Sequence, residues 1–440
     1  MKLSGTAKKF VANFGWIMGQ QVYSLLLSLV VGSLSARYLG PSNYGLLNYG
    51  ESILAFFTII SRLGLESVLI NEMLRTPEKR GSYLGTALVM RLLTSIGSLF
   101  CIMGIVRVLE PDNQVLHVIT LLQSFAVILQ TYEVFDYWFQ MELKMKYVSI
   151  ATMIALTVVG VWRVTLLATE ATVYFFALSG SVQYLVCGGV VVFLFLRQRG
   201  KDLKLSFNRK DGTALLRKSY HFIISSLAVT LYTQIDKIMI GKFLDTKALG
   251  VYSVAAVVAI LWECIPNALI RSARPLIIKQ REANREEYIR RFQYLLLGIT
   301  LLSVTVGIGI SLFGKFIVWF LYGESYLEAA RPLSILIWST GFAMIGTARG
   351  IWIVAEGHNR YVKYYVFIGA IINFVMNLAV IPFFGITGAA VTTLISQIVV
   401  ALLSPLLFKQ TRPFVVCYFQ AFKWLPELVK MAVSAIRRRR

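Results

Sequence analysis

Charged residues are scarce in this chain of 440 residues. Asp, Glu, Lys and Arg make up 15% of the sequence, whereas an ordinary soluble domain contains about 25%. Apolar residues make up 57%, and the mean hydropathy is +0.68. A soluble fold cannot bury that much apolar surface, so the composition predicts an integral membrane protein. Long polar stretches are lacking too, since the longest, Arg197 to Ser219, is too short for a catalytic domain.

Cysteine and histidine are also rare. Neither type shows the spacing of a metal site or a disulfide framework, and the cysteines lie mostly in apolar runs. We therefore expect inert thiols, no metal site and no bound cofactor. The residues concerned are Cys101, Cys187, Cys264, Cys417, His117, His221 and His358.

Long apolar runs fill most of the chain. A membrane span needs about 20 apolar residues, and the runs predict about twelve such helices. The first six cover residues 10–36, 44–70, 83–106, 115–132, 147–168 and 173–196. The second six cover residues 222–243, 249–270, 292–313, 333–354, 364–381 and 388–408.

Acidic residues are half as numerous as basic ones, 22 against 44, which gives a net charge of +22. In a soluble protein this excess would suggest nucleic acid. Here most basic residues fall in alternate loops between the predicted spans, and the opposite loops hold few, such as Arg37, Arg107 and Lys242. Loops rich in Lys and Arg stay in the cytoplasm. We therefore expect a multi-pass protein with both termini cytoplasmic and no nucleic-acid partner.

An internal repeat joins the two halves of the chain. Residues 37–46 align without a gap with residues 242–251, and each segment leads from one predicted span into the next. Six spans in each half would place both halves in the same orientation, as in a parallel repeat about an axis along the membrane normal. The alternative is a turn chemistry shared by two corners. The repeat predicts an all-α membrane protein with two six-helix lobes around a central cavity.

The predicted organisation has four parts. These are a first lobe over residues 1–200, a basic cytoplasmic linker over 201–218, a second lobe over 219–410 and a basic amphipathic tail over 411–440. In the tail, Lys423, Lys430 and Arg437 recur every seven residues and share one helical face. This spacing is typical of an interfacial helix on anionic lipid. A basic tail that only fixes the topology is the alternative.

Several motifs carry a family likeness. The segment Ala36-Arg37-Tyr38-Leu39-Gly40-Pro41, followed by Tyr44-Gly45, resembles the N-terminal signature of Wzx-type polysaccharide flippases. These belong to the multidrug/oligosaccharidyl-lipid/polysaccharide exporter superfamily. The likeness covers residues 1 to about 410. Further segments that fit it are 137–140 with 144–145, 236–241 with 250–253, 321–326, and Pro382 with 385–390.

The resemblance implies a function. A flippase of this kind carries undecaprenyl-pyrophosphate-linked oligosaccharide, such as O-antigen or exopolysaccharide units, from the cytoplasmic to the outer leaflet by alternating access. It also implies the cell (inner or plasma) membrane as the location, and lipid-linked oligosaccharide and other polysaccharide assembly proteins as partners.

Basic residues within spans are costly, so each is a candidate for binding the pyrophosphate. Arg91 is the strongest, because it lies about eight residues, roughly 12 Å, inside its span; an ion pair with a carboxylate of another span is the alternative. Lys237 is a deep candidate as well. Arg62 and Arg349 lie nearer the cytoplasmic ends, where they suit the mouth of a path or simply snorkel to the interface. Gln20 and Gln21 are candidates for contacts to sugar.

Three deep carboxylates, Asp236, Glu51 and Glu263, are candidates for coupling transport to a proton or sodium gradient. Structural ties between helices are the alternative for each.

Two rival functions remain open. A drug or cation antiporter of the same superfamily would need an anionic cavity. A membrane-embedded polysaccharide polymerase or ligase would need a long outer loop with catalytic residues, and the predicted outer loops are short. A lipid II flippase would bring two further spans, which the short basic tail does not supply. We therefore expect a transporter and not an enzyme.

Overall fold

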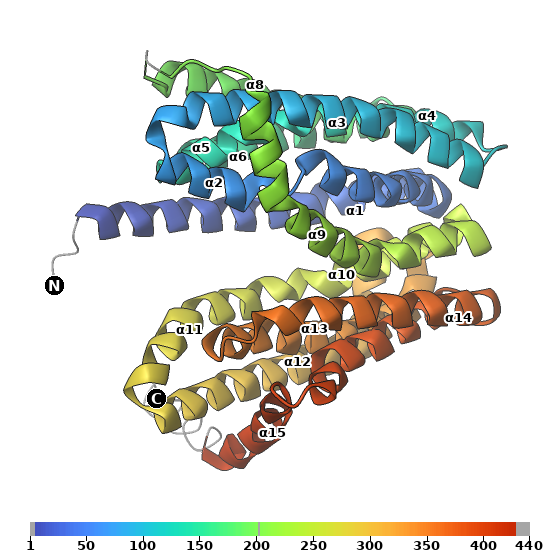
Figure 1. Ribbon diagram of the computed structural model, residues 1–440. Helices are drawn as coiled ribbons and strands as arrows, with labels where there is room; N and C mark the ends of the chain where they lie inside the picture. Colours follow the sequence, from blue (N-terminus) through green and yellow to red (C-terminus); the bar gives the residue numbers. More distant parts are fainter. Residues whose placement is uncertain (1–4, 201–202, 428–440) are drawn as a thin grey trace, which may run out of the picture. The chain divides into compact units, whose positions relative to one another are not determined.

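The computed structural model describes residues 5–200 and 203–427, and within these ranges the chain forms helices and no strands (Figure 1). Short 3₁₀ turns and loops join the helices. In the first part of the chain these are α1 (Gly5–Arg62), α2 (Leu65–Arg75), α3 (Arg80–Leu109), α4 (Gln114–Leu129), α5 (Glu133–Met141), α6 (Met145–Ala168), α7 (Val173–Ala177), α8 (Ser179–Gln198) and α9 (Arg209–Phe243). The rest are α10 (Thr246–Ile260), α11 (Cys264–Ala283), α12 (Arg285–Tyr322), α13 (Ala330–Ala355), α14 (Val362–Ile398) and α15 (Arg412–Gln420).

Nine helical segments of the described chain are long and apolar enough to cross a membrane. They confirm a multi-pass membrane protein, while the count of twelve spans and the side of the termini stay predictions. α13, which contains the predicted span 333–354, is not among the nine. The segments are Gly15–Arg75, Pro77–Leu109, Gln114–Met141, Met145–Ala168, Val173–Gln198, Arg209–Phe243, Thr246–Ala283, Arg285–Tyr322 and Asn359–Leu407.

Two of these long helices contain a sharp break. α1 breaks at Gly40, whose φ is 70° and ψ 168°, and Pro41 follows directly. α14 breaks at Gly385, whose φ is 59° and ψ −146°, three residues after Pro382. Positive φ is accessible to glycine because it lacks a Cβ. Each break falls between two predicted spans, so one long helix contains the first span and only part of the second, because α1 ends at Arg62 and α14 at Ile398.

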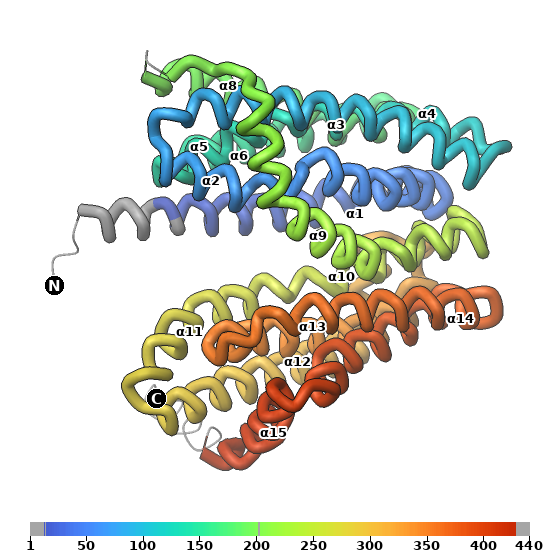
Figure 2. Tube along the Cα trace, viewed as in Figure 1, coloured from blue at the N-terminus to red at the C-terminus, as the bar shows by residue number. Residues whose placement is uncertain are grey.

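The chain divides into two compact units, residues 1–250 and 251–440. In the first unit, aromatic and aliphatic side chains of α2, α3, α5, α6 and α8 form a buried core around Trp138 and Phe195. α9 packs on α1, α2 and α3 and crosses them steeply (Figure 2). α9 contains the predicted span 222–243, which was expected in the second lobe and lies in the first unit. The lobe boundaries stay a prediction.

The predicted linker is partly structured. Residues 203–208 lie along α3, where the Ser206 amide donates to the Gly81 carbonyl at 3.3 Å and the Asn208 amide donates to Oγ1 of Thr86 at 2.9 Å. The Asn208 side chain then accepts from the Lys210 amide and caps α9. The end of the linker is therefore the first turns of a helix.

The second unit has a core of its own, formed by α11, α12, α13 and α15. In the predicted tail, α15 buries Phe414, Cys417 and Tyr418 in this core, while Val416 and Phe419 are 54% and 62% exposed. This part of the tail is a packed helix with a second, exposed apolar side. Lys430 and Arg437, two of the three residues in the predicted heptad spacing, lie outside the described residues.

The two copies of the predicted repeat touch each other within the first unit. A Cβ at Gly45 would overlap the carbonyl oxygen of Thr246, and a Cβ at Gly250 would overlap that of Pro41. In the repeat alignment, Pro41 corresponds to Thr246 and Gly45 to Gly250. The contact is therefore reciprocal, as two copies of one segment make when they meet about a two-fold axis. This reciprocity supports the predicted repeat.

Candidate functional site

The first unit contains a cavity of about 460 Å³ that is lined mainly by polar side chains. Its walls come from the second half of α1, from α4 and the 3₁₀ turn that follows it, from α6 and α9, and from the end of α7 and the start of α8. We call it the Arg62–Arg163 cavity, after the two basic residues that line it. Four amides, a phenol and three hydroxyls also line it: Gln123, Gln130, Gln183, Gln234, Tyr184, Thr58, Thr230 and Thr233.

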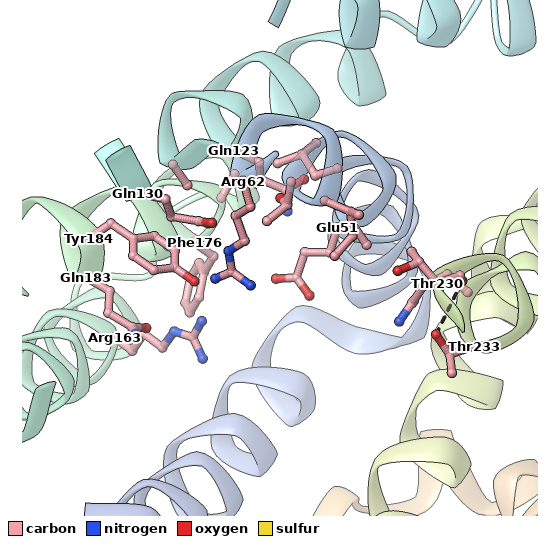
Figure 3. Close-up of a pocket in the computed structure, with 18 residues that line it drawn as sticks. Glu51, Arg62, Gln123, Gln130, Arg163, Phe176, Gln183, Tyr184, Thr230 and Thr233 are labelled. Atoms are coloured by element: carbon pink, nitrogen blue, oxygen red, sulfur yellow. Dashed lines mark hydrogen bonds between the residues drawn. The ribbon is translucent and has the colours of Figure 1, made fainter. Parts of the chain in front are cut away.

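Three ionisable side chains determine the charge of this cavity. Arg62 on α1 and Arg163 on α6 point into the same open space (Figure 3). The carboxylate of Glu51, which is also on α1, faces that space. Two guanidinium groups against one carboxylate give a positive lining. Such a lining attracts an anion, and guanidinium groups bind phosphate oxygens through paired hydrogen bonds.

Arg62 is held in place by Glu133, at the start of α5. Its Nε donates to Oε2 of Glu133 at 3.0 Å and its Nη2 to Oε1 at 2.6 Å. The Arg62 side chain is nevertheless 39% exposed, against 13% for Glu133. The ion pair therefore orients the guanidinium and leaves part of it accessible from the cavity.

Arg91 lies behind this pair and does not line the cavity. It is fully buried, and its Nη2 donates to Oε2 of Glu133 at 3.0 Å and to the Gln130 carbonyl at 3.1 Å. Its Nε and Nη1 are buried without a hydrogen-bond partner among the described residues. Arg91 therefore forms an ion pair with Glu133, a carboxylate of another segment, which is the alternative that the sequence left open. Arg91 positions Glu133, and through it Arg62.

The sequence analysis missed Arg163 and Glu133. Arg163 lies on α6, five residues before the helix ends, and its Nε is buried without a hydrogen-bond partner among the described residues. Its place near the end of a span makes it look like an ordinary interfacial arginine. Glu133 follows directly after the predicted span 115–132, where the end of the apolar run indicates a loop. In the structure the 3₁₀ turn Gln130–Tyr132 continues into α5 instead.

Among the predicted ion-coupling residues, Glu51 lines the cavity. Asp236 and Lys237 lie on α9, just beyond the cavity residue Gln234, and do not line it. Asp236 is buried and Lys237 is half-buried. The structure thus groups one predicted carboxylate with the cavity and leaves the adjacent pair at its edge.

The other sugar and coupling candidates lie elsewhere. Gln20 and Gln21 lie in the first half of α1, half-buried and exposed respectively, and neither lines the cavity. Glu263 ends the 3₁₀ turn Leu261–Glu263 in the second unit, where it is half-buried. None of the three shares a site with Arg62.

Arg349 is enclosed in the second unit. Its Nη1 donates to the Ala401 carbonyl at 3.0 Å and also bonds to the Val400 carbonyl, in the π-helical turn Val399–Leu403. The guanidinium lies 4.5 Å from the ring centre of Tyr365 and 5.9 Å from that of Phe414. Arg349 is 5% exposed. These contacts tie α13 to α14 and α15. The place of Arg349 at the mouth of a path stays a prediction.

Metal ligands do not gather in the described part of the chain. Within residues 5–200 and 203–427, no group of three or more His, Cys, Asp or Glu side chains could hold a metal ion. The four cysteines are free. On α15, burial raises the pKa of the Cys417 thiol to about 11, so that thiol is protonated, and unreactive, at neutral pH.

Comparison with known proteins decides the family. A family model described as "Polysaccharide biosynthesis protein" matches residues 10–273, which are more than half of the chain. The chain belongs to this family. A second model, MatE, matches residues 222–379. The predicted resemblance is confirmed, and the chain is a member of the multidrug/oligosaccharidyl-lipid/polysaccharide exporter superfamily.

Curated relatives are similar at low identity. The capsular polysaccharide biosynthesis protein CapF of Staphylococcus aureus is 23% identical over 408 residues, which are 88% of this chain and 96% of CapF. The probable flippase AglR of Haloferax volcanii is 27% identical over 203 residues, which are 44% of this chain and 42% of AglR. The chain therefore matches less than half the length of AglR and nearly all of CapF.

Solved structures share the fold. The lipid II flippase MurJ in an inward closed conformation aligns with a TM-score of 0.73 and 14% identity, over 93% of this chain and 92% of MurJ. An inward-facing multidrug resistance transporter of the MATE family aligns with a TM-score of 0.67 and 13% identity, over 95% and 96% of the two chains. At such identity the likeness supports the fold and not the substrate.

Proposed function

We propose that this protein is a flippase that moves undecaprenyl-pyrophosphate-linked oligosaccharide from the cytoplasmic to the outer leaflet by alternating access. The observation that carries the proposal is the Arg62–Arg163 cavity, a positively charged, amide-lined space inside a chain of the polysaccharide biosynthesis family. A transporter, and not an enzyme, is also what the names of two relatives favour, since both are called probable flippases.

The two arginines have different roles in this proposal. Glu133 already accepts two hydrogen bonds from Arg62, which leaves this guanidinium oriented and partly neutralised. Arg163 has a buried Nε without a partner among the described residues, and a buried donor without a partner costs free energy. The outer nitrogens of the same guanidinium point into the cavity (Figure 3), where a phosphate oxygen would accept from them. Arg163 is therefore the first contact for the pyrophosphate, and Arg62 the second.

The amides around the arginines suit the sugar. Gln123, for example, donates from Nε2 to the Leu47 carbonyl at 3.0 Å, while its Oε1 is buried without a partner among the described residues. The side chain is thus fixed in orientation, with its Oε1 packed against Gly50. Amide side chains that line a cavity and are already held in one orientation lose little side-chain entropy when a sugar binds.

Translocation in proteoliposomes tests the proposal. Defined lipid-linked oligosaccharide is loaded, and its access to an impermeant sugar-modifying enzyme is followed with and without imposed proton or sodium gradients. A charge-assisted hydrogen bond contributes about 1.5–3 kcal/mol, so Arg163→Gln should slow translocation by about ten- to a hundredfold. The matched control is Arg107→Gln, an exposed arginine at the end of α3 outside the cavity. Equal rates for wild type and Arg163→Gln would refute the role of Arg163.

Glu51 is the residue we propose for coupling to the ion gradient, because it lines the cavity and Glu263 and Asp236 do not. Glu51→Gln should remove the dependence on an imposed proton or sodium gradient, while the rate without a gradient changes little. Glu263→Gln serves as the control. Loss of the gradient response in the control alone would transfer the coupling role to Glu263.

The MatE match over residues 222–379 favours a second candidate, an ion-coupled multidrug or cation antiporter. Its cavity should attract cations, whereas the Arg62–Arg163 cavity has two guanidinium groups against one carboxylate. Export of a small organic cation from the same proteoliposomes, combined with no movement of several lipid-linked sugars, would decide for the antiporter.

A further inference from the structure

A second cavity, in the second unit, has no part in the proposed transport path. Its volume is about 410 Å³, and it lies between the start of α12, the end of α13 and the helix α15. We call it the Lys409 pocket. It is lined by Arg285, Tyr288, Ile289, Trp352, Glu356, Lys409, Arg412, Pro413, Val416, Cys417 and Gln420.

The charges of the Lys409 pocket are unbalanced. Arg285, Lys409 and Arg412 are all exposed, and Glu356 is the acidic residue that lines it. Glu356 already pairs with Arg281 at 3.5 Å, and Arg285 is 3.9 Å away. Arg281, which does not line the pocket, thus neutralises much of the Glu356 charge. The exposed cations Arg285, Lys409 and Arg412 leave the pocket with a net positive charge.

Buried polar atoms lie at the floor of the same pocket. The hydroxyl of Tyr288, a residue that is 1% exposed, lies beside the carboxylate of Glu356, so these two buried groups face each other. Arg412 uses its Nε to donate to the Leu406 carbonyl at 2.7 Å. That bond fixes the side chain and leaves the outer part of its guanidinium available. The donors that an oxygen-rich anion meets here are therefore the exposed cations Arg285, Lys409 and Arg412.

Apolar surface adjoins the cations. Val416, at the rim of the pocket, is 54% exposed, and Leu407 and Phe419 nearby on the chain are 61% and 62% exposed. Trp352 forms part of the pocket wall, and tryptophan is enriched where bilayers meet water. A free inorganic anion would make no favourable contact with the apolar rim. An anionic lipid would contact the cations with its head group and the apolar rim with its chains.

We infer that the Lys409 pocket binds the phosphate head group of an anionic bilayer lipid, with α15 lying in the membrane interface. A zwitterionic lipid would bring a cationic group toward three cations, so an anionic lipid is favoured. The inference does not depend on the proposed flippase function. Loss of transport and loss of lipid binding can each occur without the other.

Fluorescence quenching of Trp352 tests the inference on the purified full-length protein in detergent. Phosphatidylglycerol with brominated chains is titrated, and the signal of Trp352→Phe is subtracted to isolate the pocket. A cation near an anionic lipid contributes about 1 kcal/mol, which is about a fivefold change in affinity. Lys409→Gln should raise the apparent dissociation constant about fivefold, and Lys409→Gln with Arg412→Gln about 25-fold.

Controls separate this site from general attraction. The matched variant, Arg360→Gln with Lys363→Gln, removes two exposed cations of the same unit outside the pocket and should leave the affinity unchanged. Brominated phosphatidylcholine should quench the Trp352 component far less, and inorganic phosphate should not displace the lipid. Unchanged affinity in Lys409→Gln, equal quenching by phosphatidylcholine, or displacement by inorganic phosphate would each overturn the inference. If the double variant does not fold, Lys409→Gln decides alone, because no contact restrains that exposed side chain in the described structure.

Discussion

Substituting Glu133 by glutamine removes the charge that Arg62 and Arg91 share. Arg91 is fully buried, and the carboxylate lies 3.0 Å from its Nη2. With a neutral amide in that place, the buried guanidinium of Arg91 loses the carboxylate that it bonds, and Asp136 of α5 is the carboxylate that remains near it. Breaking a buried ion pair from one side costs about 3–5 kcal/mol, because the remaining charge is uncompensated.

The expected change in melting temperature follows from the size of the first unit, residues 1–250. A loss of 1 kcal/mol lowers the melting temperature of a domain of that size by about 2–4 °C. Glu133→Gln should therefore lower the apparent melting temperature of the purified protein by about 6–20 °C. Thermal unfolding in detergent, followed by tryptophan fluorescence at one fixed scan rate, measures it.

Glu142→Gln is the matched control, since it makes the same chemical change further along the same segment. Glu142 pairs with Arg80 at 3.4 Å, and both side chains are about 30% exposed. Pairs of that exposure contribute at most about 1 kcal/mol. A further variant, Arg91→Met with Glu133→Gln, should recover part of the loss, because apolar replacements for a buried pair are often tolerated. Melting temperatures of Glu133→Gln and Glu142→Gln within about 2 °C of each other would refute the reasoning.

Three other predictions follow from close contacts. Gly45→Ala should lower the yield and melting temperature, because its Cβ overlaps the Thr246 carbonyl, whereas Gly97→Ala, with open space around it, should leave both unchanged. Arg349→Leu should destabilise the second unit by about 1.5–3 kcal/mol per lost charged hydrogen bond, with transport per folded molecule unchanged; loss of transport at normal stability would restore its predicted substrate role. Asn377→Leu should cost about 1–2 kcal/mol in a chemical unfolding titration, because Asn377 accepts from Thr392 across the break in α14; an unchanged midpoint would show that this bond is dispensable.

The long apolar runs predicted most of the helices, because the demand for internal backbone hydrogen bonds leaves a membrane segment few other choices. Segment ends were harder. At Glu133 the apolar pattern stops, so the sequence indicates a loop, yet the backbone turns through Gln130–Tyr132 and continues as α5. The acidic side chain is tolerated there because two arginines from other segments meet it. Partners this far apart in sequence leave no local signal.

The tail was difficult for a similar reason. Its basic spacing predicts an interfacial helix, and this pattern does not reveal that Phe414 and Cys417 face the core of the second unit. α15 has apolar side chains both on the side that is buried in the core and on the side that is exposed, so the helix has no single amphipathic face. The Lys409 pocket forms where this helix meets α12 and α13, so its residues, from Arg285 to Gln420, become neighbours only in the fold.

Depth along a predicted span and the surroundings in the fold give different rankings of the intramembrane arginines as ligand-binding candidates. Depth alone places Arg91 first, because a guanidinium far from either interface cannot reach water. The structure gives Arg91 a counter-charge and no access to a cavity, and gives Arg349 two carbonyl acceptors and an aromatic enclosure. Arg163 lies closer to a helix end, yet it faces a polar cavity with a donor left without a partner in the described chain. An anion can reach a half-buried guanidinium that faces a polar cavity and cannot reach an enclosed one. The arginine with access to a cavity, and not the deepest one, is therefore the better candidate for binding a ligand.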